Sequence, residues 1–229
     1  MKHGKKYRTI AEKVDDNKEY SLEEAFTIIK ANAAAKFNES VEVHVKLNIN
    51  PKKSDEAVRA TAELPYGTGR TKKVAVVTST KAKEAETAGA VLVGGEEIVE
   101  QIKDGKIMPG SDFDVLLATP EMMPKLAKVA KILGPKGLMP SPKNETVTAK
   151  VAEAVEMLSK GKRISFKNDD SGNVHQVIGK TSFSMEELTG NFAAFREAIQ
   201  KAKSDSVKGR FVKSASVCST MGPGMRISF

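Results

Sequence analysis

Cysteine, histidine and tryptophan are scarce in this 229-residue chain. Cys218 is the only cysteine, and tryptophan is absent. A single cysteine excludes a disulfide framework and a cysteine-based zinc site. His3, His44 and His175 are too few and too far apart in the sequence to predict a metal cluster. Aromatic residues make up only 5% of the chain, which disfavours a nucleic-acid-binding surface built mainly on base stacking.

The sequence also lacks an apolar run long enough to cross a membrane. A transmembrane helix needs about 20 consecutive apolar residues, and the basic N-terminal segment is not followed by the apolar stretch of a secretory signal. We therefore expect a cytoplasmic protein that has no membrane partner. A composition of 40% hydrophobic and 29% charged residues is typical of a globular protein.

Positive charge is in excess and unevenly distributed. The chain has 37 Lys and Arg against 29 Asp and Glu, so its net charge is +8. Residues 1–67 and 68–159 each carry a net charge of +1, whereas residues 160–229 carry +6. This concentration favours a polyanionic partner. A charged surface that only keeps the protein in solution is the alternative.

The middle of the chain alternates short apolar strands with amphipathic helices. The strands are predicted over residues 74–77, 91–93 and 114–118. The helices are predicted over residues 81–88, from Ile98 to near Gly105, from Met122 to Leu133 and from Val147 to Leu158. Strands that alternate with helices indicate a parallel sheet with helices on its faces. We expect a small, three-layer, Rossmann-like α/β domain over residues 68–159.

The two ends of the chain follow a different pattern. A capping box at Ser21 begins a helix, and apolar residues alternate with polar ones over 41–47. Residues 164–178 predict a β-hairpin, and a helix and a strand follow it. Neither end alone can bury an adequate core. We expect residues 1–67 and 160–229 to form one discontinuous α+β domain, an antiparallel sheet with two helices, into which the α/β domain is inserted.

The two crossings between these domains are rich in glycine. Gly67 and Gly69 lie at the first crossing and Gly161 at the second. Glycine accepts backbone conformations that other residues avoid, so we predict a hinge at these positions.

A stiff loop follows the helix that ends at Leu133. Gly134 is expected to take the left-handed conformation that ends a helix, and Pro135 cannot continue one. The loop carries Lys136 and Lys143 and no side chain that exchanges a proton near neutral pH. We expect this loop to present backbone amides and positive charge to an anionic surface. A helix–strand connection that is merely rich in Pro and Gly is the alternative.

No motif in the sequence supports catalysis. The phosphate-binding pattern GxxxxGK[ST] is absent, and Gly94-Gly95 alone is a weak nucleotide-binding signal. No nucleophile-elbow pattern marks a serine. We expect a protein that is not an enzyme and needs neither a cofactor nor a metal ion.

Two segments have a composition that favours contact with RNA. Phe37 follows a helix end and precedes Asn38, where its ring can lie on a ribose or base. The alternative is that the ring closes the apolar stripe of that helix. The segment Thr220-Met221-Gly222 combines a hydroxyl, a flexible apolar side chain and a close backbone approach, which suits the shallow minor groove of RNA. A plain turn is the alternative.

These segments together resemble one family. Residues 134–140 with the apolar helix before them, and residues 220–223 near the C-terminus, are similar to motifs of the bacterial L-one family of large-subunit ribosomal proteins. Residues 36–40 and 172–175 also resemble family positions. The resemblance extends over nearly the whole length of the chain, with the motifs in the same order.

The resemblance implies a function in translation. It implies a two-domain ribosomal protein that binds 23S rRNA in the mobile stalk of the large subunit, beside other large-subunit components, and is a monomer when free. It also implies contact with departing exit-site tRNA, and repression through binding to the messenger RNA of its own operon. Carried over residue by residue, the expected RNA contacts are Lys36, Phe37, Ser40, Glu42, Lys167, His175, Thr220, Met221 and Gly222. A nonspecific nucleic-acid chaperone and a small α/β enzyme are the alternatives.

Overall fold

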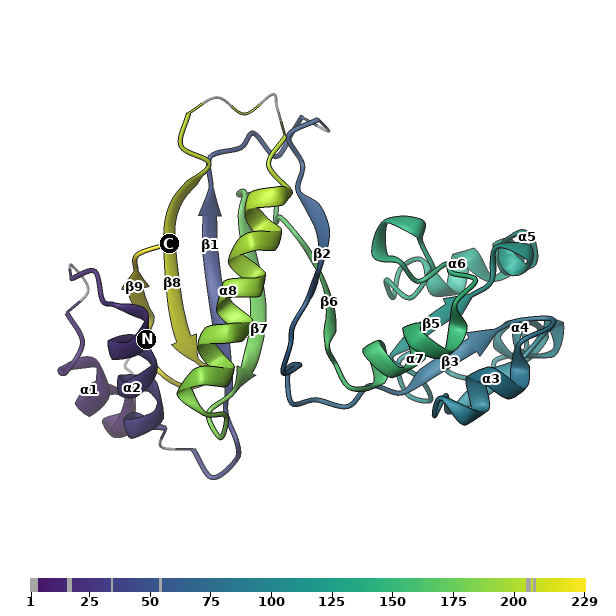
Figure 1. The fold of residues 1–229 in the computed structure, drawn as a ribbon, viewed down its shortest axis with the longest axis horizontal. Coiled ribbons are helices and arrows are strands. Elements are labelled where there is room, and N and C mark those ends of the chain that lie inside the picture. The colour runs from purple at the N-terminus through teal and green to yellow at the C-terminus, as the bar shows by residue number, and fades with distance from the viewer. Residues whose placement is uncertain (1–3, 16–17, 34, 54, 205–206, 208) are drawn as a thin grey trace. The chain divides into compact units, whose positions relative to one another are not determined.

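The computed structural model describes residues 4–15, 18–33, 35–53, 55–204, 207 and 209–229 (Figure 1). The chain divides into two compact units. Unit 1 comprises Met1–Gly69 and Ser165–Phe229, and unit 2 comprises Arg70–Ile164. These boundaries lie two and five residues beyond the predicted domain crossings. Whether the units behave as independent domains joined by a hinge stays a prediction.

Unit 1 is built on a four-stranded antiparallel sheet, as the ends of the sequence predicted. The strand order is β7-β1-β8-β9. The strands are β1 (Ser40–Leu47), β7 (Asn173–Lys180), β8 (Val212–Ser219) and β9 (Met225–Ile227). Strand β1, from the N-terminal segment, therefore lies between two strands from the C-terminal segment, so neither segment can complete the sheet alone (Figure 1).

Two helices cover one face of this sheet. Helices α2 (Leu22–Asn32) and α8 (Met185–Lys201) contact each other and the strands (Figure 1). Each begins with a capping box, Ser21 with Glu24 and Ser184 with Glu187, which satisfies backbone amides at the helix start. Alternate residues of β1 are buried, so its polar side chains lie on the opposite face. A further short helix, α1 (Lys5–Ala11), was not predicted.

A second, two-stranded sheet consists of β2 (Arg59–Glu63) and β6 (Arg163–Lys167). The sequence predicted that β6 would form a hairpin with β7, and this is wrong. Only an isolated bridge between Asn168 and Val174 joins the two segments. The turn residues were read correctly, but alternating polarity does not specify which strand is the partner.

Unit 2 contains a parallel three-stranded sheet with the order β4-β3-β5. Its strands are β3 (Val74–Val77), β4 (Leu92–Gly94) and β5 (Val115–Ala118). Its helices are α3 (Ala82–Thr87), α4 (Glu96–Lys103), α5 (Met123–Leu126), α6 (Ala130–Leu133) and α7 (Val151–Ser159). One apolar cluster joins the sheet to α4, α5 and α6, and another joins it to α3 and α7. Helices thus cover both faces, and none of the described helices has the length and apolar character needed to span a bilayer.

Three expectations for unit 2 need correction. Val91 is exposed rather than part of a buried strand, because β4 lies at the edge of the sheet. The predicted helix over 122–133 starts in the 3-10 turn η1 (Pro120–Met122) and is interrupted by the 3-10 turn η2 (Ala127–Val129). Its large apolar positions, Met122, Leu126, Val129 and Leu133, are buried as expected. Val147 is not in α7 but forms a parallel bridge to Ala118.

The loop after Leu133 packs against unit 2. Gly134 has φ −58° and ψ −55°, so the predicted left-handed conformation is wrong at this position, and Gly137 adopts it instead with φ +70°. The amides of Gly137 and Leu138 donate to the carbonyls of Gly134 and Leu133. They are therefore not available to an anion. Leu138 packs against the apolar cluster of α4 and α6, so the motif has a structural function.

Each glycine at the two crossings is explained by a different local contact or conformation. Gly161 (φ +63°) follows α7 and ends it with a Schellman motif, in which Lys162 N donates to Met157 O. Gly67 (φ +70°) is buried, and its carbonyl accepts from Asn191 in α8. A β-carbon on Gly69 would lie 2.9 Å from Lys180 Cγ. A hinge at these positions stays a prediction.

The observed boundaries also change the distribution of charge. Unit 1 contains 21 basic and 17 acidic residues and unit 2 contains 16 and 12, so each carries a net charge of +4. Lys160, Lys162 and Arg163, which contribute to the basic C-terminal segment, belong to unit 2. The positive charge that the sequence concentrates in residues 160–229 is therefore shared between the two units.

We expect Asn191→Ala to lower the free energy of unfolding by about 2–4 kcal/mol. Asn191 is fully buried, donates to the carbonyls of Gly67 and Ile178, and accepts from Tyr66 N. Alanine leaves these backbone groups unpaired. Urea unfolding measures the loss, and Gln200→Ala on the exposed side of α8 is the matched control. Equal stability of the two variants would contradict this account of Asn191.

Candidate nucleic-acid interface

The loop before β1 and the turn after β8 lie side by side. Ser40 N donates to Thr220 Oγ1 and Thr220 N donates to Ser40 O, both at 3.0 Å. These bonds continue the β1–β8 pairing, in which Val41 faces Ser219. Residues 180 positions apart thereby become neighbours. We call residues 35–40 and 219–222 the platform.

The buried side chain of Glu39 joins the two halves of the platform. Its side chain is only 1% exposed. One carboxylate oxygen accepts from Ala35 N at 3.1 Å and the other from Met221 N at 3.2 Å. Its main-chain carbonyl accepts from Thr181 N, directly after β7. A buried carboxylate needs such donors to offset its lost hydration. Glu39 is not conspicuous in the sequence, because a glutamate between polar residues gives no sign of burial.

Phe37 and Met221 extend outward from the two halves of the platform. The exposed fractions are 57% for Phe37 and 60% for Met221. The alternative for Phe37, that it closes the apolar stripe of α2, is therefore wrong. Lys36, beside it, is also exposed. Two large apolar side chains on anchored backbone, next to a positive charge, form a surface suited to a sugar or base edge.

Glycine is needed at position 222 because other atoms lie close to its Cα, and not because its backbone dihedral angles are unusual. A β-carbon at this position would lie 2.6 Å from Ser219 Oγ, and Ser219 is buried. Gly222 N donates to Ser219 O and closes the turn. The close backbone approach that the sequence predicted here was an approach to RNA, and that stays a prediction.

The other predicted contact residues are distributed over three strands. Ser40 is in β1, where its hydroxyl accepts from Lys180 Nζ at 2.8 Å. Glu42 is in β1 and His175 in β7, and both belong to the sheet face opposite the helices. Lys167 is exposed on β6, in the separate two-stranded sheet, and is not part of the platform.

The face of the sheet opposite α2 and α8, which we call the open face, holds a cluster of histidines. His44 and His175 are paired across β1 and β7, with their Nδ1 atoms 2.8 Å apart. His44 Nε2 lies 3.2 Å from Cys218 Sγ. The expectation that histidines are too scattered to cluster is therefore wrong for these two, because strand pairing brings distant positions together. Burial, and then the neighbouring His175, lower the pKa of His44, which favours its neutral form.

One of the two lysines of the basic loop in unit 2 is hydrogen-bonded within that unit. Lys136 Nζ donates to Pro109 O at 2.7 Å, which ties it to the same unit. Lys143 lies in the 3-10 turn η3 (Pro142–Asn144), and its side chain is outside the described part of the structure. Nucleic-acid contact by this loop stays a prediction.

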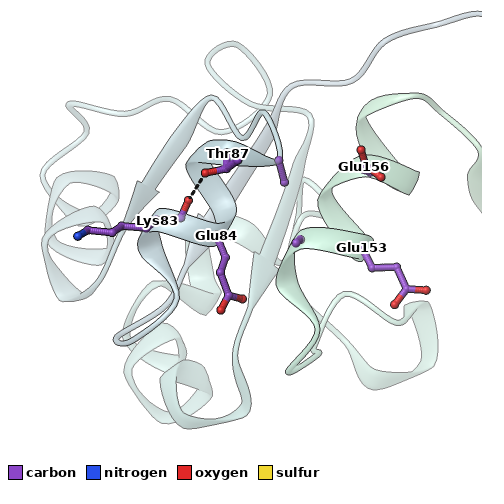
Figure 2. Close-up of a pocket in the computed structure, with 7 residues that line it drawn as sticks. Lys83, Glu84, Thr87, Glu153 and Glu156 are labelled. Carbon is purple, nitrogen blue, oxygen red and sulfur yellow. Dashed lines mark hydrogen bonds between the residues drawn. The ribbon is translucent and has the colours of Figure 1, made fainter.

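A groove of about 660 Å³ lies between α3 and α7 (Figure 2). Its polar lining includes three carboxylates, from Glu84, Glu153 and Glu156. The lining contains no serine, cysteine or histidine, and the hydroxyl of Thr87 donates to the main-chain carbonyl of Lys83 at 2.8 Å rather than to a carboxylate. Its negative charges also disfavour a phosphate backbone.

Comparison with known proteins decides the family. Residues 29–223 match the family described as Ribosomal protein L1p/L10e family. The chain belongs to this family. Proteins named large ribosomal subunit protein uL1 are 46% identical in Mycoplasma capricolum, 47% in Thermus thermophilus and 48% in Deinococcus radiodurans. The matches cover 99–100% of this chain and 96–99% of those proteins.

Membership in the L1p/L10e family confirms the resemblance seen in the sequence. The protein is a component of the large ribosomal subunit, and is thus cytoplasmic and not an enzyme. The matched region includes both halves of the platform and all of unit 2.

We expect Glu39→Ala to loosen both halves of the platform. Hydrogen bonds to a charged acceptor contribute roughly 1.5–3 kcal/mol, so amide exchange at Ala35 and Met221 should accelerate about tenfold or more. Exchange measured by NMR checks this, with Glu100→Ala on the exposed side of α4 as the control. Unchanged protection at both amides would show that Glu39 does not hold the platform.

We expect Gly222→Ala to cost about 1–3 kcal/mol of stability, because the new methyl group meets Ser219 Oγ. Gly224→Ala is the matched control, since nothing lies within 4 Å of a β-carbon there. Urea unfolding of the two variants provides the comparison. A Gly222→Ala protein as stable as the control would refute the close-packed turn.

Proposed function

We propose that unit 1 binds a folded segment of 23S rRNA through the platform. The observation that carries the proposal is the joint exposure of Phe37 and Met221 on backbone that buried Glu39 anchors. An anchored surface loses little conformational entropy when it binds. It can therefore select RNA by shape rather than by adapting to it.

The proposed contacts divide into two kinds. Lys36 and Lys167, both exposed, attract the phosphate backbone without regard to sequence. Phe37 and Met221 lie against sugar or base edges, and Gly222 lets the backbone come close. The polar groups of Ser40, Glu42, His175 and Thr220 are placed to exchange hydrogen bonds with 2′-hydroxyls, which distinguish RNA from DNA.

Unit 2 is proposed to face departing tRNA at the exit site. Its net charge of +4 supports a polyanionic neighbour, and Lys136 and Lys143 are the candidate contacts. Movement of unit 2 on the segments after Gly69 and before Ser165 would accompany tRNA release. Repression through the protein's own operon mRNA uses, in this proposal, the same platform, because an RNA that mimics the ribosomal segment presents the same shape. The free protein is proposed to be a monomer.

A nonspecific nucleic-acid chaperone is the rival function. Charge alone would support it, because each unit is positive. The platform favours the specific function, since general phosphate binding does not require two exposed apolar side chains on anchored backbone. Competition between a folded 23S fragment and duplex DNA of equal length separates the two. Equal affinity for both would establish the chaperone.

We expect Met221→Ala to weaken binding of the 23S fragment by roughly 1–3 kcal/mol, about five- to 150-fold. Met108→Ala is the matched control, because the side chains of Met108 and Met221 are each 60% exposed and Met108 belongs to unit 2. Isothermal titration or filter binding at a fixed salt concentration measures the change. Equal affinity of the two variants would remove Met221 from the interface.

A further inference from the structure

Three potential metal ligands meet on the open face of the unit 1 sheet. Glu42 and His44 come from β1 and Cys218 from β8. Their ligand atoms all lie within 4.8 Å of one another, and each residue is partly buried. Glu42 and Cys218 are direct partners in the β1–β8 register, and His44 follows two residues along the same face. The sheet itself therefore fixes the spacing.

A chain of neighbouring groups orients His44. The Nδ1 of His44 lies 2.8 Å from that of His175, and His175 Nε2 lies 3.5 Å from Asp169 Oδ2. Hydrogen bonds from Asn173 hold the pKa of Asp169 at about 2, so this carboxylate is charged at neutral pH. The arrangement fits a His175 that donates to Asp169 and accepts from His44. His44 then keeps its proton on Nδ1 and directs the lone pair of Nε2 toward Cys218.

We propose that Glu42, His44 and Cys218 form a binding site for a divalent transition-metal ion, with Zn²⁺ as the best fit. A thiolate, an imidazole and a carboxylate are a zinc ligand set, whereas Ca²⁺ and Mg²⁺ prefer oxygen alone. From zinc bond lengths of about 2.3 Å to sulfur and 2.0–2.1 Å to nitrogen, tetrahedral ligands lie about 3.6 Å apart. His44 Nε2 and Cys218 Sγ are already 3.2 Å apart, so a small separation of the two side chains admits the ion.

Proton balance is simple at this site. Burial, and then the charge of Glu42, raise the pKa of the Cys218 thiol to about 11, so the thiol is protonated in the free protein. It can donate to His44 Nε2. When the ion binds, the thiol proton leaves to solvent, and sulfur and nitrogen both bond to the metal. Three protein ligands leave a fourth position for water.

His175 acts in this site as a positioning residue. It touches His44 rather than the ion, and its removal frees the imidazole of His44 to change tautomer or rotate. Loss of such a partner typically weakens metal affinity by about 10–100-fold. The site goes beyond the proposed RNA-binding function. It shares Glu42 and His175 with the proposed RNA contacts, so it is tested on the full chain in the absence of RNA.

Titration of the full-length protein with Co²⁺ provides the direct test. Cys218 is the only cysteine, so thiolate-to-cobalt charge-transfer absorption can arise only from this residue. We expect the absorption to saturate at one ion per chain and to be displaced by Zn²⁺. Cys218→Ser should abolish it, and His44→Gln and His175→Gln should each weaken binding at least tenfold. His3→Gln, which replaces the third histidine of the chain, should bind Co²⁺ like the parent.

Two outcomes of the Co²⁺ titration would overturn the site. One is the absence of thiolate absorption in the parent protein at millimolar Co²⁺. The other is binding that persists unchanged in His44→Gln. Because a variant that does not fold could mimic loss of binding, circular dichroism of each variant accompanies the titration. Protection of Cys218 in the parent protein from a thiol reagent by stoichiometric Zn²⁺ gives a readout that needs no variant, and lack of protection also contradicts the proposal.

Discussion

The buried carboxylate of Glu39 is the interaction on which the proposed function most depends. It accepts hydrogen bonds from the loop that carries Phe37 and from the turn that carries Met221. Without this shared acceptor, the Ser40–Thr220 hydrogen bonds would still join the loop and the turn, but the backbone at Phe37 and Met221 would be less restrained. Their alignment would then have to be created on binding, at an entropic cost. The site therefore consists of an exposed recognition surface and a buried anionic support.

The platform and the open face both belong to the four-stranded sheet of unit 1. Strand β1 lies between strands contributed by the other end of the chain. The platform is therefore complete only when the two ends of the chain are paired. Alternation along β1 directs valines into the core under α2 and α8, and directs Glu42 and His44 to the open face. The platform lies where β1 begins and β8 ends, and the candidate metal ligands lie within the sheet beside it. The proposed RNA recognition and the proposed metal binding thus depend on one strand register.

Much of the fold could be predicted because it follows periodicity. The buried stripes of α2 and α8, the alternation of β1 and the apolar run of β3 are local patterns, and they specify their elements. The sequence also singles out Phe37, Met221 and Gly222, because each is unusual in its local setting, and their contact with RNA stays a prediction. It does not single out Glu39 or the His44–Cys218 contact, since their significance arises from pairing between residues more than 130 positions apart. The loop at 134–140 was predicted to be a binding surface because its glycines and prolines do not reveal that Leu138 packs against the apolar cluster.

A double-mutant cycle between Glu39 and Met221 in binding to the 23S fragment tests the central claim most directly. If Glu39 contributes to affinity by holding the Met221 turn, Met221→Ala should cost much less in a Glu39→Ala background than in the parent protein. Residues that act together show interaction energies of about 0.5–3 kcal/mol. A coupling in this range is the predicted result. Fully additive effects would show that the two residues contribute independently, and would contradict the platform as a single unit.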